Sequence, residues 1–160
     1  MTNLGDASAF SAIMPNISTI GSRPIRMLIS APELNWRDSV IARLNELVAL
    51  EIGWDGYDGR PVSFEVANFA LRVLETVCQV DAPEPQIVPG NSGDLQIEWH
   101  TPEGDIELHV REPNDVHAWR SQTTPVESIS ELFLKTDFIE VAGWIKELGE
   151  PSRAASVAAA

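Results

Sequence analysis

The sequence has a single cysteine, few basic residues and no long apolar run, and each shortage excludes a class of protein. Cys78 alone cannot form a disulfide within the chain, so stability does not depend on an oxidising compartment. No stretch approaches the roughly 18 apolar residues that a transmembrane helix needs. Residues 1–20 lack the basic and apolar regions of a secretory signal. We therefore expect a soluble, cytoplasmic protein.

The usual catalytic motifs are also missing. The sequence contains no nucleophile elbow, no glycine loop that would cradle phosphates before a helix, and no paired-cysteine spacing for a metal. Cys78 falls near the apolar side of a predicted helix, which is typical of an inert buried thiol. The sequence therefore favours a protein that is not an enzyme, with an unfamiliar active site as the alternative.

The net charge is −13, and it is unevenly distributed along the chain. Residues 84–150 carry fourteen acidic and four basic side chains. An acidic surface repels the phosphates of nucleic acids, so direct binding to DNA or RNA is disfavoured. Such a surface suits a basic protein partner, although solubility alone would also explain it.

A single α+β domain is predicted over residues 32–149. Residues 1–31 mix small, polar and isolated apolar residues without a period, which indicates a flexible N-terminal arm. Residues 150–160 end in an alanine-rich stretch that we expect to be a disordered tail. No internal repeat is visible in the sequence.

Two N-terminal helices are predicted from apolar residues that recur every three or four positions. The first should begin near Pro32, with Ser30 as its cap, and end before Gly53. The second should begin after Ser63 as its N-cap and end at residues 81–85. The apolar positions are Trp36, Val40, Leu44, Leu47 and Val48 in the first helix, and Val66, Phe69, Ala70, Val73, Leu74 and Val77 in the second.

The period then changes from helical to two, which indicates strands. Apolar and polar residues alternate over 94–100, 105–111 and 116–119, with turn residues at 101–104 and 112–114. This predicts an antiparallel β-meander of three to five strands, in which 86–88 adds a first strand and 126–134 is either a strand or a loop. A C-terminal helix after Thr136 should pack on one face of the sheet, giving a two-layer domain.

The expected strand register brings acidic residues together on the solvated face. If the turn at 101–104 pairs His100 with Asp105, then Glu98 lies opposite Glu107. Like charges that are directly opposed cost free energy, so this pair would favour a cation or a basic side chain of a partner.

The next turn brings two histidines to the same face. If it pairs Arg111 with Asp115, then His109 lies opposite His117. Two histidines and two carboxylates can bind zinc or a similar divalent metal. The alternative is that these are ordinary polar residues on a solvated strand face. The metal hypothesis therefore needs four residues to converge: Glu98, Glu107, His109 and His117.

The loop at residues 53–61 is the second candidate site. The spacing of Asp55 and Asp58 is not that of a calcium-binding EF-hand loop, and no Glu stands where its bidentate ligand belongs. The Asp-Gly pairs are typical of tight turns that lock a connection between helices. Alternatively, the loop binds a partner through Trp54, Asp55, Tyr57 and Asp58, since aromatic loop residues make good anchors.

Three segments together resemble a known group of small bacterial proteins that are mostly uncharacterised. These are Gly-Trp-Asp-Gly-Tyr-x-Gly-x-Pro-Val-Ser at 53–63, Pro-Glu-Pro-Gln-Ile-Val-Pro at 83–89 and Leu-Gln-Ile-Glu-Trp-His at 95–100. The resemblance covers about residues 44–120, and it implies a helix–loop–helix–meander arrangement and a bacterial source. It implies no catalytic residues. Asp58 departs from the pattern, since the group often has a small residue there.

Three functions remain open at this point. The sequence favours a non-catalytic, acidic protein-binding module: an antitoxin- or immunity-type inhibitor, or a subunit of a bacterial complex, with a basic partner and with Glu98 and Glu107 as partner-binding residues. The first alternative is a metal-dependent enzyme that uses the Glu/His cluster, and otherwise no cofactor is expected. The second is a structural or assembly component whose N-terminal arm orders on a larger complex. The sequence does not define the oligomeric state.

Overall fold

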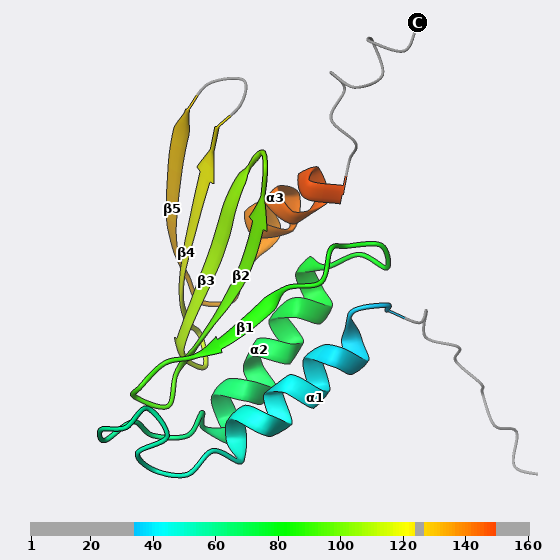
Figure 1. The fold of residues 1–160 in the computed structure, drawn as a ribbon. Coiled ribbons are helices and arrows are strands. Elements are labelled where there is room, and N and C mark those ends of the chain that lie inside the picture. Colours follow the sequence, from blue (N-terminus) through cyan, green and yellow to red (C-terminus); the bar gives the residue numbers. More distant parts are fainter. Residues whose placement is uncertain (1–33, 124–126, 150–160) are drawn as a thin grey trace, which may run out of the picture. The chain divides into compact units, whose positions relative to one another are not determined.

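The computed structural model describes residues 34–123 and 127–149, and it confirms an α+β fold (Figure 1). The predicted arm at 1–31 and the predicted tail at 150–160 lie outside the described residues, so they stay predictions. The described elements are α1 (Arg37–Val48), α2 (Phe64–Val77), β1 (Gln86–Pro89), β2 (Leu95–Thr101), β3 (Gly104–Glu112), β4 (Asp115–Gln122), β5 (Ser128–Leu134) and α3 (Ile139–Gly149).

The five strands form one antiparallel sheet in the order β1-β2-β3-β4-β5. Each strand therefore pairs with its neighbour in the sequence, as in the predicted meander. The segment that the sequence left open between strand and loop is strand β5, which pairs with β4 along its whole length. None of the helices among the described residues is long and apolar enough to cross a membrane.

Helix α1 begins later than the sequence predicts. Its first residue is Arg37, and Trp36 stands at the N-cap without a side-chain capping bond. The expected cap, Ser30, lies outside the described residues. Trp36 is buried, and its indole N–H donates to the carbonyl oxygen of Gln79 at 3.2 Å. This contact ties the start of α1 to the segment that follows α2.

Helix α2 begins as predicted but ends earlier. The Ser63 hydroxyl accepts a hydrogen bond from the backbone N–H of Val66 at 3.2 Å, which confirms the predicted N-cap. The last helical residue is Val77, because Cys78 already has an extended backbone (φ −92°, ψ 130°). The prolines at 83 and 85, which were expected to stop the helix, lie beyond its true end.

Helix α3 begins at Ile139, and not directly after Thr136 as predicted. The side chain that accepts a backbone N–H at this helix start is Asp137, which is bonded to Ile139 at 3.0 Å, and not Thr136. Both residue types are favoured caps, so the sequence pattern does not distinguish them.

The core lies between the sheet and the helices. Alternate strand residues on one face are almost fully buried, and they pack against buried positions of all three helices. The indole of Trp99, on this face of β2, donates to the carbonyl oxygen of Pro83 at 2.9 Å. The buried residues of the sheet are Ile87, Leu95, Ile97, Trp99, Ile106, Leu108, Val110, Val116 and Ala118.

One charged side chain, Arg120, is buried on the core side of β4. It is 9% exposed, it pairs with Glu147 of α3, and its guanidinium lies 5.9 Å from the centre of the Trp144 ring. A buried charge is tolerated when it is paired and hydrogen-bonded. Arg120 therefore links the C-terminal helix to the sheet.

The hairpin between β2 and β3 depends on a glycine, and this dependence can be tested. Gly104 has φ +148°, and a Cβ there would overlap the backbone of Ser121. Gly143 in α3 has open space around its Cα. We expect Gly104→Ala to lower the free energy of unfolding by about 2 kcal/mol or more, while Gly143→Ala raises it by about 0.5–1 kcal/mol.

Urea unfolding of the two variants and the wild type measures both changes. The variants carry the same added methyl group, so they differ only in backbone conformation and surroundings. Equal stabilities would contradict the role that we assign to Gly104.

Candidate functional site

The sheet face that points away from the helices is the candidate site, and we call it the outer face (Figure 1). Its side chains alternate with the buried core positions of the same strands. The register confirms the predicted pairs, since His100 lies opposite Asp105 and Glu98 lies opposite Glu107. The outer face of β2 to β5 consists of Gln96, Glu98, His100, Asp105, Glu107, His109, His117, Trp119, Ser121, Ile129, Glu131 and Phe133.

The turn between β3 and β4 departs from the expected register. His109 lies opposite His117, as predicted, but Asp115 pairs with Glu112 and not with Arg111. The irregularity falls between Val110 and Glu112, beyond the histidines, so it does not move them. Arg111 instead forms a side-chain ion pair with Asp115 at 2.7 Å.

Each histidine on the outer face has a carboxylate partner. His100 contacts Asp105 at 2.9 Å and Glu98 at 3.1 Å. His117 contacts Glu131 at 2.6 Å. His109 contacts Asp94, from the turn that precedes β2. These three histidines are all the histidines of the chain. The outer face therefore carries local pairs and not one convergent cluster.

The pairs disfavour the metal hypothesis. Glu98, Glu107, His109 and His117 do share the outer face, but His109 and His117 are bonded to different carboxylates. In residues 34–123 and 127–149, no group of three or more His, Cys, Asp or Glu side chains is arranged to hold a metal ion. The repulsion between the carboxylates of Glu98 and Glu107 is reduced by His100, whose ring contacts Glu98.

Two groups in these pairs have shifted pKa values. Burial of Asp94 opposes its ionisation, but the hydrogen bonds from His109 and from the backbone N–H of Ser92 outweigh that effect and hold the Asp94 pKa below its ordinary value. The hydrogen bonds to Asp105 and Glu98 raise the pKa of His100. The first shift favours the ionised Asp94 carboxylate, and the second favours the protonated His100 ring.

Exposed apolar side chains accompany these charges at the β5 side of the outer face. Phe133 is 70% exposed and Ile129 is 68% exposed. The rings of His117 and Phe133 stack with centroids 4.6 Å apart and planes 5° from parallel. Half-buried Trp119 lies between Glu107 and Glu131 in the register. An exposed apolar patch beside charged residues is typical of a binding surface.

The loop that contains Trp54 is held by its own side chains. Asp55 accepts the backbone N–H groups of Tyr57 at 2.9 Å and Gly59 at 3.0 Å, and these bonds lower the Asp55 pKa. The indole of Trp54 donates to the carbonyl oxygen of Arg60 at 3.0 Å. Trp54 and Asp55 therefore have structural roles. Tyr57 is 87% exposed and Asp58 is also exposed. Partner binding by these four loop residues stays a prediction.

The same loop is joined to the end of the sheet. The backbone N–H of Arg60 donates to Asn91 at 2.9 Å, and that of Ser63 donates to Gly93 at 3.0 Å. Residues 91 and 93 belong to the turn that also holds Asp94, the partner of His109. The loop and the outer face thus meet at this turn.

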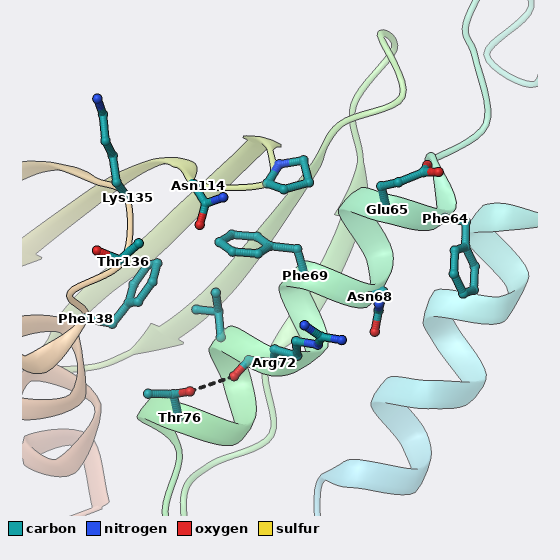
Figure 2. A pocket seen from close by; sticks show the side chains of 12 residues that line it. Phe64, Glu65, Asn68, Phe69, Arg72, Thr76, Asn114, Lys135, Thr136 and Phe138 are labelled. Carbon is teal, nitrogen blue, oxygen red and sulfur yellow. Dashed lines mark hydrogen bonds between the residues drawn. The ribbon is translucent and has the colours of Figure 1, made fainter.

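A groove of about 580 Å³ lies elsewhere, between α2, the β3–β4 turn and the start of α3 (Figure 2). The rings of Phe69 and Phe138 form part of its wall, 6.3 Å apart. Arg72 and Lys135 both line the groove, but Figure 2 shows that they extend to different sides. These two cations do not converge on one point, as a site for a small anion would require.

Cys78 offers no nucleophile. It is buried between α2 and the chain that follows, and burial raises the pKa of its thiol to about 12. The thiolate, which is the reactive form, is therefore scarce at neutral pH. This agrees with the inert core thiol that the sequence indicates.

No family model, no curated protein and no solved structure matches this chain. The resemblance to small bacterial proteins in the loop at 53–63 and in the segment at 95–100 therefore stays a prediction.

The sequence did not identify several residues of the site. In the sequence, His100 only helps to define the register of the first turn. In the structure, its ring contacts two carboxylates, those of Asp105 and Glu98. The sequence does not point to Asp94, because this residue lies in a turn and the strand register does not report which strand residue it contacts. Ile129 and Phe133 were missed because β5 was not assigned. No alternation of apolar and polar residues marks 129–134, where Leu132, Phe133 and Leu134 follow one another, so the usual signal of a strand is absent there.

The two aspartates of the loop provide a matched test of its internal bonds. We expect Asp55→Ala to speed hydrogen exchange at the Tyr57 and Gly59 amides, because both lose their acceptor. Asp58→Ala removes the same charge without removing these bonds, so exchange there should not change. Equal exchange in the two variants would show that Asp55 does not organise the loop.

The pKa of His100 can be followed by NMR titration of its ring. We expect a value above the ordinary 6.5, and we expect Asp105→Asn to lower it. Because the folded-state pKa is raised, the stabilisation by these bonds is full below about pH 6.5 and is lost as the pH rises through the raised value. Glu107→Gln removes a nearby charge that is not bonded to His100, and it serves as the control. If Asp105→Asn leaves the His100 pKa unchanged, the pairing of His100 with Asp105 is contradicted.

Proposed function

We propose that the protein is a non-catalytic module that binds a basic protein partner through the outer face of its sheet. The observation that carries this proposal is the composition of that face. It combines four carboxylates and three histidines with exposed apolar residues, and Arg111, at the end of β3, is paired with Asp115. The four carboxylates are Glu98, Asp105, Glu107 and Glu131.

The composition of the face supports a macromolecular partner. Two grooves, of about 580 and 400 Å³, lie elsewhere and are lined by residues of the helices, the turns and β1. Protein interfaces commonly have an aromatic or apolar centre with a polar rim. Trp119 and Phe133 would supply the apolar contacts, and Glu107 and Glu131, which flank Trp119 in the register, would supply charged contacts beside them.

The charge of the outer face would then determine how fast the partner associates and which partners are rejected. A face that is acidic over several strands attracts a basic surface, raises the association rate and rejects acidic partners. Tyr57 and Asp58, at the end of the sheet, would add an aromatic contact and one more charge. An inhibitor of a basic enzyme, as antitoxin- and immunity-type proteins are, fits this description, as does an acidic subunit of a bacterial complex. A cytoplasmic location is part of the proposal.

The alternatives have less support. A metal-dependent enzyme would need a ligand cluster, and the described residues do not form one. A role as an assembly component would rest on the N-terminal arm, which lies outside the described residues.

The proposal predicts that reversing charge on the outer face disrupts partner capture. We expect wild-type protein, used as bait in an extract of its source cells, to retain a specific basic protein. Glu98→Lys with Glu107→Lys should weaken that affinity by more than about tenfold, because two attractive charges become repulsive. Quantitative mass spectrometry at two salt concentrations measures the retained protein, and higher salt should also weaken retention.

The matched control is Glu51→Lys with Asp81→Lys. These exposed residues lie outside the sheet strands, and their substitution changes the net charge by the same amount. The control variant should retain the partner. If both variants lose it equally, the net charge and not the outer face is responsible, and if neither loses it, the proposed surface is wrong.

A further inference from the structure

The two edges of the sheet are protected to different degrees. At one edge, β1 has only four residues and ends at Pro89. The Arg43 side chain of α1 donates its Nε–H to the carbonyl oxygen of Ile87 in β1 at 3.1 Å, and Ser39 and Arg43 line a cavity together with this strand. A short strand, a proline and a covering helix are common ways to prevent further pairing.

In the part of the chain that the structure describes, the other edge has none of these devices. Strand β5 has seven residues, contains no proline or basic residue, and pairs with β4 without a register shift. Among residues 34–123 and 127–149, no element other than β4 pairs with β5. In an edge strand, alternate backbone N–H and C=O groups point away from the sheet and can pair with another strand.

The side chains of β5 define what a new strand would meet. Ile129, Glu131 and Phe133 face outward, and Leu132 and Leu134 are half-buried on the core side. In a strand added beside β5, every second side chain would lie next to the outward residues, and the others would lie next to the two leucines. Apolar side chains would cover the leucines, and a basic side chain would lie near Glu131.

We propose that the β5 edge binds an extended segment of the basic partner as a sixth strand of the sheet. The segment alternates basic residues on the outer face with apolar residues on the core side. This inference rests on the proposed function and specifies how the partner is held: main-chain hydrogen bonds supply affinity, and the alternating side chains supply specificity. Charge complementarity selects a basic partner over a second copy, because two chains of net charge −13 repel each other.

The probe for this inference is a synthetic peptide that alternates lysine with valine. We expect it to bind the full chain and to slow hydrogen exchange at amides of β5. A peptide with glutamate in place of lysine should bind at least about tenfold more weakly, because it opposes Glu131 with like charge. A peptide of the same composition with its lysines and valines in two blocks should also bind more weakly, since it cannot match the two faces.

Two double variants with identical substitutions test the location. Ile129→Lys with Phe133→Lys places charge on the edge strand, and it should weaken peptide binding by about tenfold or more. Ile139→Lys with Phe64→Lys makes the same chemical change at exposed positions of the helix layer, and it should leave binding unchanged. Circular dichroism on heating verifies that both variants fold.

Several outcomes would overturn the inference. Equal peptide affinity in the two variants would do so, as would slowed exchange only in strands other than β5. Sedimentation equilibrium that shows a dimer, which Ile129→Lys with Phe133→Lys converts to a monomer, would place a second copy at the edge. If Glu98→Lys with Glu107→Lys loses the native partner while the β5 variant retains it, the proposed function stands and the edge inference fails. If both retain it, both fail.

Discussion

The pairing of β2 with β3 determines which side chains enter the core and which reach the outer face. In that register Leu95 and Val110 are paired and fully buried, while Glu98 and Glu107 face outward. A shift of one residue would exchange the two faces, and it would place carboxylates against the helices. The burial of the apolar set therefore specifies the register, and the acidic face on the other side follows from it.

The acidic face remains compatible with folding because its charges are partly paired. Each histidine lies beside a carboxylate, and the pKa values of His100 and Asp94 are shifted in the directions that favour ion pairs. Like charges across neighbouring strands would otherwise destabilise the sheet. Glu107 forms no hydrogen bond or ion pair among the described side chains. Glu107 is thus a charge that no described side chain neutralises.

Much of the fold was predictable from the sequence, and the failures have physical causes. The Ser63 cap, the meander and the facing pairs were predictable because strand alternation and tight turns are local patterns. Strand β5 was not, because its apolar residues lie on both faces and resemble a loop with scattered hydrophobics. At the start of α1, Trp36 contacts Gln79, which is 43 residues away. A local sequence pattern cannot predict such a contact. The link between His109 and Asp94 escaped prediction for the same reason.

The contact between Arg43 and Ile87 also has a consequence for the order of folding. The meander joins neighbours in the sequence, so its hairpins can form early. At the β1 edge, the contact with α1 spans 44 residues of chain. Before α1 docks, the β1 edge therefore lacks the helix that covers it in the folded chain. A chain delayed at that stage would be exposed to self-association through β1, and a weakened α1 would be expected to increase aggregation during refolding more than it lowers the final stability.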